Sequence, residues 1–248
     1  MRFLLISLLF LVSCGLQTVQ EIHDASVELH TYHCYTQCPL GQAVTSDLIV
    51  RNLYTISAND RTKMADWVAY RLSYDMFSTR NETNRSWKSD PWLEDEERLE
   101  PSDYDGAYEE LSTDRGHLAP LASFQSTEWW KETNYLSNIV PQPSALNRGA
   151  WLEIENNERQ LAADGHDVYV LTGPAYDHSA LALPKADEYH RVPSAFWKSI
   201  LAFKDGVLIS SLQYFFSDSG NYSVQNATST ISDIEAYTGL ILYPGGDP

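Results

Sequence analysis

Positive charge is scarce in this sequence. Its 248 residues contain 17 lysines and arginines against 34 aspartates and glutamates, which gives a formal net charge of −17. A field of this sign repels polyanions at long range, so any surface that binds nucleic acid must be basic only locally. The composition therefore excludes a broad basic surface. It is also compatible with function at high salt, and halotolerance is one hypothesis that follows from it.

An apolar run long enough to span a bilayer is missing from the N-terminus, where one would anchor the chain. Residues 1–12 read MRFLLISLLFLV, a basic Arg2 followed by an apolar stretch that is too short for a transmembrane helix. This pattern is typical of a secretory signal, so we expect a signal over residues 1–20 and one exported domain over 21–248, secreted or periplasmic. The segment Leu11-Val12-Ser13-Cys14 also resembles a bacterial lipobox, which would anchor the protein to the outer membrane through a lipid on Cys14. An ordinary signal with a chance cysteine is the alternative.

Cysteine is rare, with three residues in the chain. With Cys14 in the signal, Cys34 and Cys38 form a C-x3-C pair, and export favours a disulfide between them. His30 and His33 lie close by, and histidine and cysteine are the usual ligands of zinc. No further pair follows at zinc-finger spacing, so the disulfide is the favoured interpretation.

Internal repeats, low-complexity tracts and linkers are absent, which indicates a single domain. Residues 78–105 are polar and contain prolines, and they predict a long surface loop. Elsewhere, apolar patterning and turn residues predict a mixed α+β fold. The expected strands cover residues 48–56, 65–73, 167–172, 197–204, 206–216 and 240–242, and the expected helices cover residues 149–163 and 231–237.

The segment TDRGHLAP, Thr113 to Pro120, contains a candidate for catalysis. His117 could take a proton from water, and Arg115 could contact phosphate oxygens. This pairing suits the cleavage of a phosphodiester. Taken alone, however, an R-G-H triplet is more often an incidental surface turn.

A second candidate pattern lies about thirty residues further on. Asn147, Trp151, Glu155 and Arg159 recur at every fourth position, so a helix that begins near Asn147 would place them on one stripe. The alternative is an ordinary ion-pair row, with Glu155 and Arg159 in the favourable order and a tryptophan in the core. The combination with the upstream histidine favours a functional site.

The amide oxygen of Asn147 is a suitable ligand for magnesium, which prefers oxygen and keeps several waters. Glu155 lies eight residues along the helix, about 12 Å away. At that distance its carboxylate would not share the inner shell of the metal, so we expect it to orient metal-bound water.

Together these motifs make the chain resemble the Serratia-type DNA/RNA non-specific endonucleases, part of the ββα-metal nuclease group that also includes endonuclease G. The resemblance runs from the Cys34 pair to the end of the chain. The motifs that carry it are WVAY at Trp67, NRSWKSDP at Asn84, TDRGHLAPLAS at Thr113, NYLSNIVPQ at Asn134, LNRGAW at Leu146, LTGP at Leu171 and PSAFWK at Pro193.

The resemblance implies a central antiparallel sheet flanked by helices, with a ββα-metal motif at the active site. It implies that His117 is the general base, that Asn147 is the direct ligand of Mg²⁺, for which Mn²⁺ could substitute, and that Glu155 holds the metal through water. Arg115 would contact phosphate, and Asn138 would help to position the site.

Arg85 and Arg159 would bind substrate phosphates and stabilise the charge of the transition state. The chain departs from the family pattern in lacking the cysteines of a second, long-range disulfide and in having a short C-terminal region, so a family dimer does not carry over and the chain could be a monomer or a homodimer.

The function predicted from these features is an exported endonuclease that cleaves double- and single-stranded DNA and RNA and leaves 5′-phosphates. No protein partner is implied. One alternative is a degenerate module that binds nucleic acid without cleaving it. Another is a phosphodiesterase that acts on small phosphate diesters.

Overall fold

The structure is a computed structural model that describes residues 29–79, 85–178, 181–217, 220–246 and 248. The expected signal and Cys14 lie outside these residues. Within them, no helix combines the length and the apolar character needed to cross a membrane.

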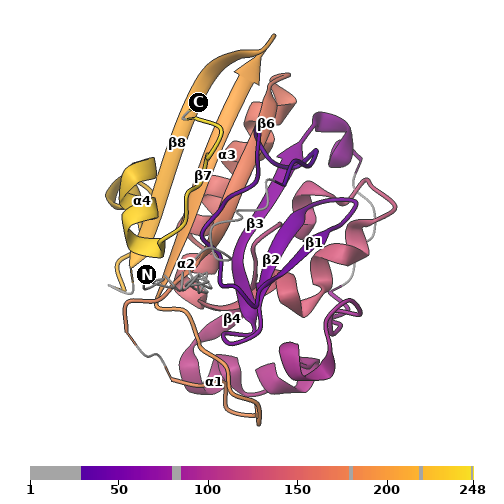
Figure 1. The fold of residues 1–248 in the computed structure, drawn as a ribbon, viewed down its shortest axis with the longest axis vertical. Coiled ribbons are helices and arrows are strands. Elements are labelled where there is room, and N and C mark those ends of the chain that lie inside the picture. The colour runs from indigo at the N-terminus through magenta and orange to yellow at the C-terminus, as the bar shows by residue number, and fades with distance from the viewer. Residues whose placement is uncertain (1–28, 80–84, 179–180, 218–219, 247) are drawn as a thin grey trace, which may run out of the picture.

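A six-stranded sheet forms the centre of the molecule (Figure 1), and every neighbouring pair of its strands is antiparallel. Its order is β1-β2-β3-β6-β7-β8, so β1 and β8 form its two edges. The strands are β1 (Asp47–Val50), β2 (Thr55–Asn59), β3 (Met64–Leu72), β6 (Asp167–Ala175), β7 (Ala195–Lys204) and β8 (Val207–Ser217).

Alternate residues of β7 divide the core between the two faces of this sheet, as the twofold period of a strand requires. Phe196 and Ile200 join the larger hydrophobic cluster, whereas Trp197 and Leu201 join the smaller one. Lys198, on the same side as Phe196 and Ile200, is fully buried. A strand buried on both faces reads as a continuous apolar run, which is why its sequence pattern is easy to detect.

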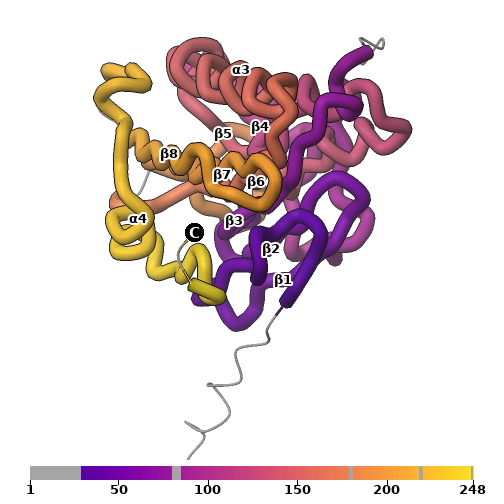
Figure 2. Tube along the Cα trace, turned by 90° about the horizontal axis from the view of Figure 1, so that it is seen from above, coloured from indigo at the N-terminus to yellow at the C-terminus, as the bar shows by residue number. Residues whose placement is uncertain are grey.

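The first face of the sheet is covered by the helix α3 (Ala150–Ala163) and by a two-stranded antiparallel sheet made of β4 (Thr113–His117) and β5 (Ile139–Pro143) (Figure 2). The short helix α2 (Ser144–Asn147) connects β5 to α3, and α1 (Ala107–Leu111) precedes β4. Two antiparallel strands followed by a helix are the predicted ββα arrangement. The prediction of an α+β fold is therefore confirmed.

The opposite face packs against the N-terminal segment that begins at residue 29 and against α4 (Ile231–Thr238). A disulfide joins Cys34 and Cys38, as predicted, and it is buried in this layer. The nearby His33 is not arranged as a zinc ligand, because its ring nitrogens contact the Thr55 hydroxyl and the Asn52 carbonyl.

Short 3-10 helices fill most of the connections. They are η2 (Tyr74–Met76), η3 (Asp95–Glu97), η4 (Pro101–Tyr104), η5 (Leu121–Ser123), η6 (Trp130–Asn134), η7 (Leu136–Asn138) and η8 (Gln225–Ala227). Residues 78–105 were expected to form a surface loop. Where described, this segment instead has buried residues, including Asp90, Leu99 and Tyr104.

Two strand predictions were wrong. Residues 48–56 form two strands, because the chain turns back at Arg51, whose N–H donates to the Tyr54 carbonyl. Residues 240–242 make a single bridge, Leu40 to Ile241, instead of a strand. The resemblance implied a ββα motif, but residue patterns did not predict strands over Thr113–His117 or Ile139–Pro143, which form β4 and β5.

Candidate active site

A cleft of about 640 Å³ opens beside β4, between the start of α3 and the segments near Trp87 and Tyr104. Five of the seven predicted site residues line it: Arg85, Arg115, His117, Asn147 and Glu155. These residues are up to 70 positions apart in sequence. The elements β4, α2 and α3 supply four of them, and Arg85 comes from the connection that precedes α1. Asn138 and Arg159 do not line the cleft.

His117 ends β4, opposite Ile139 of β5, and is partly buried. Its Nε2 lies 3.2 Å from the Asn134 amide oxygen, which can only accept, so Nε2 carries the proton and Nδ1 is left as the basic nitrogen. Burial lowers the pKa of His117 to about 4, and the nearby Arg85 charge acts in the same direction. The imidazole is therefore neutral at neutral pH, the form that a general base requires.

Asn134 was not predicted as a site residue, although it opens the NYLSN motif. The prediction gave a positioning role to Asn138, which has a different set of contacts. The buried Asn138 amide accepts from the Ala119 N–H (2.8 Å) and donates to the carbonyls of Ala119 and Thr133 (both 2.9 Å). It fixes the backbone just after His117. Asn134 orients the His117 ring through a hydrogen bond between residues 17 positions apart, and a sequence motif does not reveal such a contact.

Asp114 fixes the orientation of Asn147. The Asn147 Nδ2 donates to Asp114 Oδ2 at 2.9 Å, so the amide oxygen, the end that could bind a cation, is turned away from this carboxylate. Although partial burial opposes its ionisation, hydrogen bonds from Arg148, Asn147 and Ser144 hold the pKa of Asp114 below its usual range. Asp114 is thus a reliable acceptor, and sequence reasoning missed its role.

Asn147 does not lie on the helix that carries Glu155. It ends α2, and α3 begins at Ala150 after a break at Gly149. A side chain at Gly149 would place its Cβ 2.6 Å from the Ala145 carbonyl oxygen, so the break requires glycine. The predicted stripe is therefore wrong in geometry: Trp151 is a core residue, and Asn147 reaches the cleft from a separate helix.

Glu155 lines the cleft from the second turn of α3. Burial raises its pKa to about 7, and the Glu158 carboxylate adds to the shift, while Lys198 opposes it. A carboxylate whose ionised form is poorly solvated gains when a cation binds beside it. Its location and its pKa both suit a residue that would face a hydrated metal.

The three predicted arginines differ in their positions. Arg85 is exposed at the cleft. Arg115 donates a hydrogen bond to the Pro101 carbonyl (2.8 Å). Its guanidinium also lies within 6 Å of the Trp87 and Tyr104 rings. Arg159 is one helical turn beyond Glu155. It donates to Ser123 (3.1 Å) and Asn156 (2.7 Å) and does not reach the cleft.

A buried ion pair between α3 and β7 holds the helix against the sheet. Lys198 Nζ lies 2.8 Å from Glu158 Oε1, and both side chains are fully buried. The Tyr70 hydroxyl donates to Glu158 (2.7 Å) and accepts from Lys198 (3.0 Å). The ammonium also lies 4.7 Å from the centre of the Trp151 ring. Trp151 and Glu158 lie four positions before and three positions after Glu155 on α3. Because Lys198 contacts both, it packs against the turn of the helix that carries Glu155.

The charge of the cleft differs in sign from that of the whole chain. Arg85, Arg115 and Arg148 line it, against Asp114 and Glu155. Three cationic and two anionic side chains make this surface slightly basic, while the chain as a whole carries −17. The cleft is the kind of local basic surface that the composition requires of a protein that binds polyanions.

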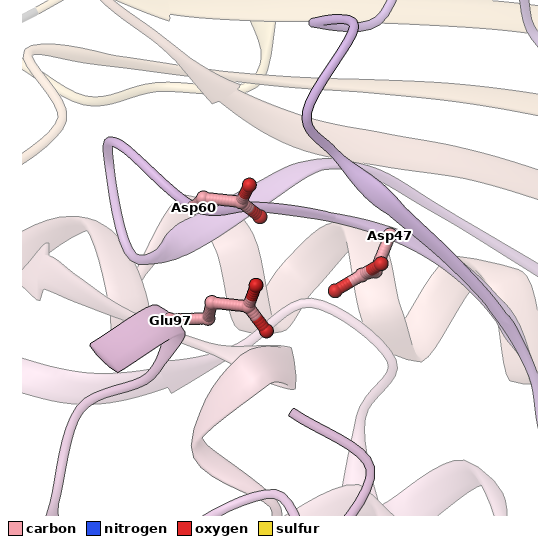
Figure 3. Close-up of side chains that lie close together, drawn as sticks. All are labelled: Asp47, Asp60 and Glu97. Carbon is pink, nitrogen blue, oxygen red and sulfur yellow. The ribbon is translucent and has the colours of Figure 1, made fainter. Parts of the chain in front are cut away.

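Two acidic groups lie elsewhere among the described residues. Asp47, Asp60 and Glu97 point toward one another from β1, from the end of β2 and from η3 (Figure 3), and Asp103, Asp187 and Glu188 form the second group. None of these side chains lines the cleft. Neither group therefore belongs to the candidate site.

Comparison with known proteins shows relatives of this chain in sequence and in fold. The chain is 37% identical to a nuclease of Serratia marcescens over 97% of its own length and 88% of that protein. It is 29% identical to the mitochondrial endonuclease G of Bos taurus, over 82% of its own length and 71% of that protein. A solved structure of the EndoG/EndoGI complex shares the fold, with a TM-score of 0.69, 23% identity and coverage of 84% of this chain and 89% of that one.

Residues 33–247 match the family model described as DNA/RNA non-specific endonuclease, a span that includes the whole cleft and nearly all of the described chain. The chain therefore belongs to the DNA/RNA non-specific endonuclease family.

Proposed function

We propose that this nuclease is an exported, magnesium-dependent endonuclease that hydrolyses DNA and RNA without selecting the sugar. One observation carries the proposal: two groups with complementary chemistry line the same cleft. One is the neutral His117 imidazole, whose Nδ1 can accept a proton. The other is the Asn147 amide oxygen, which points away from Asp114 because the amide nitrogen donates to that carboxylate. The first is a base, and the second is a ligand for a hard cation.

In the proposed reaction, Nδ1 of His117 takes a proton from water as the water oxygen attacks phosphorus. The bond from phosphorus to the 3′ oxygen breaks, and the 3′ oxygen takes a proton from a second water molecule, which a bound metal would make more acidic. The products carry a 5′-phosphate and a 3′-hydroxyl, and His117 releases its proton to solvent. Because water is the nucleophile, the 2′-hydroxyl is not required, and the same site can cleave DNA and RNA.

The other residues of the cleft fit this reaction. Asn147 would hold magnesium directly and Glu155 would hold it through water, and the bound metal would offset charge on the phosphate. Arg115, held against aromatic rings, is placed for a phosphate contact, and Arg85 is exposed for another. Contacts of this kind recognise the backbone and not the bases.

Export and salt tolerance are further parts of the proposal. Export is supported by the signal-like residues 1–20, and the net charge of −17 supports activity at several tenths molar salt. The Debye length falls from about 30 Å at 0.01 M to about 3 Å at 1 M, so salt weakens the repulsion between this acidic protein and its substrate.

The first test uses residues 21–248 with supercoiled plasmid and with RNA, with magnesium or EDTA, across a salt series. We expect both substrates to be cut, EDTA to stop cleavage, and the rate to peak or persist at several tenths molar salt. Cleavage that survives EDTA would contradict the metal, and a rate that falls steadily from low salt would contradict salt adaptation.

A second comparison separates the two alternative functions. A degenerate binding module would bind the plasmid without nicking it. A phosphodiesterase for small diesters would turn over bis-p-nitrophenyl phosphate and leave the plasmid intact. We expect plasmid nicking to be the dominant activity.

A further inference from the structure

Tyr108 and Arg148 form an exposed pair at the rim of the cleft, and the catalytic proposal does not use either residue. The Arg148 guanidinium lies 5.1 Å from the centre of the Tyr108 ring. Both residues line the cleft, and Arg148 directly follows Asn147. Tyr108 is 53% exposed, and the Arg148 side chain is 60% exposed.

Asp114 holds Arg148 in a fixed position in spite of this exposure. Nε and Nη2 of Arg148 donate to the two carboxylate oxygens of Asp114 at 2.8 and 2.6 Å. A guanidinium has five N–H donors, so this two-point contact leaves donors for another anion. The same carboxylate orients Asn147, so Asp114 couples the position of Arg148 to that of the expected metal ligand.

The ring of Tyr108 is suited to a different part of a nucleotide. An exposed tyrosine presents a flat apolar surface, and bases stack on such surfaces in proteins that bind single strands. Leu152, 43% exposed, also lines the cleft and adds apolar surface to it. A base that is paired in a duplex is already stacked and is not available to the ring.

We propose that Tyr108 and Arg148 form a subsite for one nucleotide of a single-stranded substrate, in which Arg148 contacts the phosphate and Tyr108 stacks on the unpaired base. The subsite rests on the proposed nuclease function, because it places the strand beside Asn147 and His117. It makes unpaired strands the preferred substrate for binding, and Arg148 contributes to the binding of both strand types.

Binding is measured in the His117→Ala protein, with magnesium, by the fluorescence anisotropy of a short labelled oligonucleotide, either single-stranded or annealed to its complement. We expect Tyr108→Leu to weaken single-strand binding on the order of 10-fold, and duplex binding by less than about threefold. Tyr108→Trp keeps the stacking surface and should bind the single strand as the parent does.

Arg148→Gln should weaken the binding of both oligonucleotides and reduce the slope of log affinity against log salt by about 1. The chain offers a matched control, because Arg191 lies over the Tyr176 ring at 4.7 Å and is not part of the cleft. Arg191→Gln should leave the affinity and the slope unchanged.

Unchanged single-strand binding by Tyr108→Leu, or equal losses in Tyr108→Leu and Tyr108→Trp, would overturn the stacking role. Equal slopes for Arg148→Gln and Arg191→Gln would overturn the phosphate contact. If the parent protein bound neither oligonucleotide, the proposed function itself would fail, and the subsite with it.

Discussion

The two faces of the central sheet bury different kinds of side chain. The face under α3 contains the charged pair Lys198 and Glu158, and both are fully buried. The opposite face contains the disulfide and stacked rings such as Tyr35 and Phe203, whose centroids are 4.7 Å apart. Apolar packing stabilises a fold without further help, whereas a buried ion pair must first offset the cost of removing its charges from water.

This difference coincides with the location of the cleft. Lys198 and Glu158 lie behind the turn of α3 that bears Glu155, and an ion pair accepts a narrower range of helix positions than apolar contacts do. We infer that the charged face holds the site in place and that the apolar face mainly stabilises the fold. Substitutions on the two faces should therefore have separable effects on activity and on stability.

Apart from replacement of the proposed base itself, the largest effect on activity is expected from Asn147→Ala, which removes the proposed metal ligand while Asp114 keeps Arg148 and Ser144 as partners. Loss of a metal contribution of several kcal/mol lowers kcat/KM for plasmid by at least about 100-fold. The thermal unfolding midpoint should change little. Asn157, exposed on α3, gives the control: Asn157→Ala should cleave at the wild-type rate. Activity of Asn147→Ala within about threefold of wild type would remove Asn147 from the site.

The largest effect on stability is expected from Lys198→Met. It leaves the Glu158 carboxylate buried without its cation, which costs about 3–5 kcal/mol of unfolding free energy, measured by urea denaturation. The double variant Lys198→Met, Glu158→Leu removes both charges and should recover most of this loss. If the single variant were as stable as wild type, the pair would not anchor α3.

The pH dependence of cleavage tests the state of the imidazole. Burial lowers the pKa of His117 to about 4 from 6.5, so the base stays neutral, and active, as the pH falls below 6.5. The histidine-dependent acid limb of kcat/KM, measured with saturating magnesium, should therefore lie near 4. Asn134→Asp places a carboxylate beside Nε2 of His117, which raises the pKa of His117 and should move this limb to higher pH. A wild-type limb near 6.5 that Asn134→Asp does not move would contradict the assigned environment.

The smallest effect is expected on the apolar face. The disulfide closes a very short loop, so replacing Cys34 and Cys38 by serine should lower the unfolding free energy by about 2 kcal/mol or less. Cleavage at a temperature where the variant stays folded should be unchanged. A large loss of activity in a folded Cys34→Ser, Cys38→Ser protein would show that this layer also positions the cleft.

Helices and strands were predicted correctly where the spacing of apolar residues in the sequence matches the faces that the fold buries. The expected helix 149–163 corresponds to α3, and the expected strand 65–73 to β3. β4 and β5 escaped prediction because TDRGH lacks alternating apolar residues and IVPQP contains two prolines, which argue against a strand. The turn at Arg51 has no glycine or proline. A buried ion pair with Asp90, 39 residues away, stabilises it, and no local pattern reveals such a contact.

The site was predictable to a similar extent. Motifs identified seven candidate side chains that could act as a base, a metal ligand or a phosphate contact, and the structure places five of them in one cleft. The residues that orient them were not identified, because Asn134 and Asp114 act through contacts between segments 17 and 33 residues apart. The spacing of four residues from Asn147 to Arg159 was also misleading. It predicted one helix through all four positions, but the helix is interrupted at Gly149, so Asn147 lies on α2.

The most direct test of the account is plasmid cleavage by His117→Ala, compared with His166→Ala as a histidine outside the cleft. General-base catalysis contributes about 10²–10⁴-fold, so we expect His117→Ala to lose at least about 100-fold in rate, with an unchanged unfolding midpoint and intact magnesium binding. His166→Ala should cleave normally. If folded His117→Ala retained about a tenth or more of the wild-type rate, His117 would not be the base, and the central claim would be contradicted.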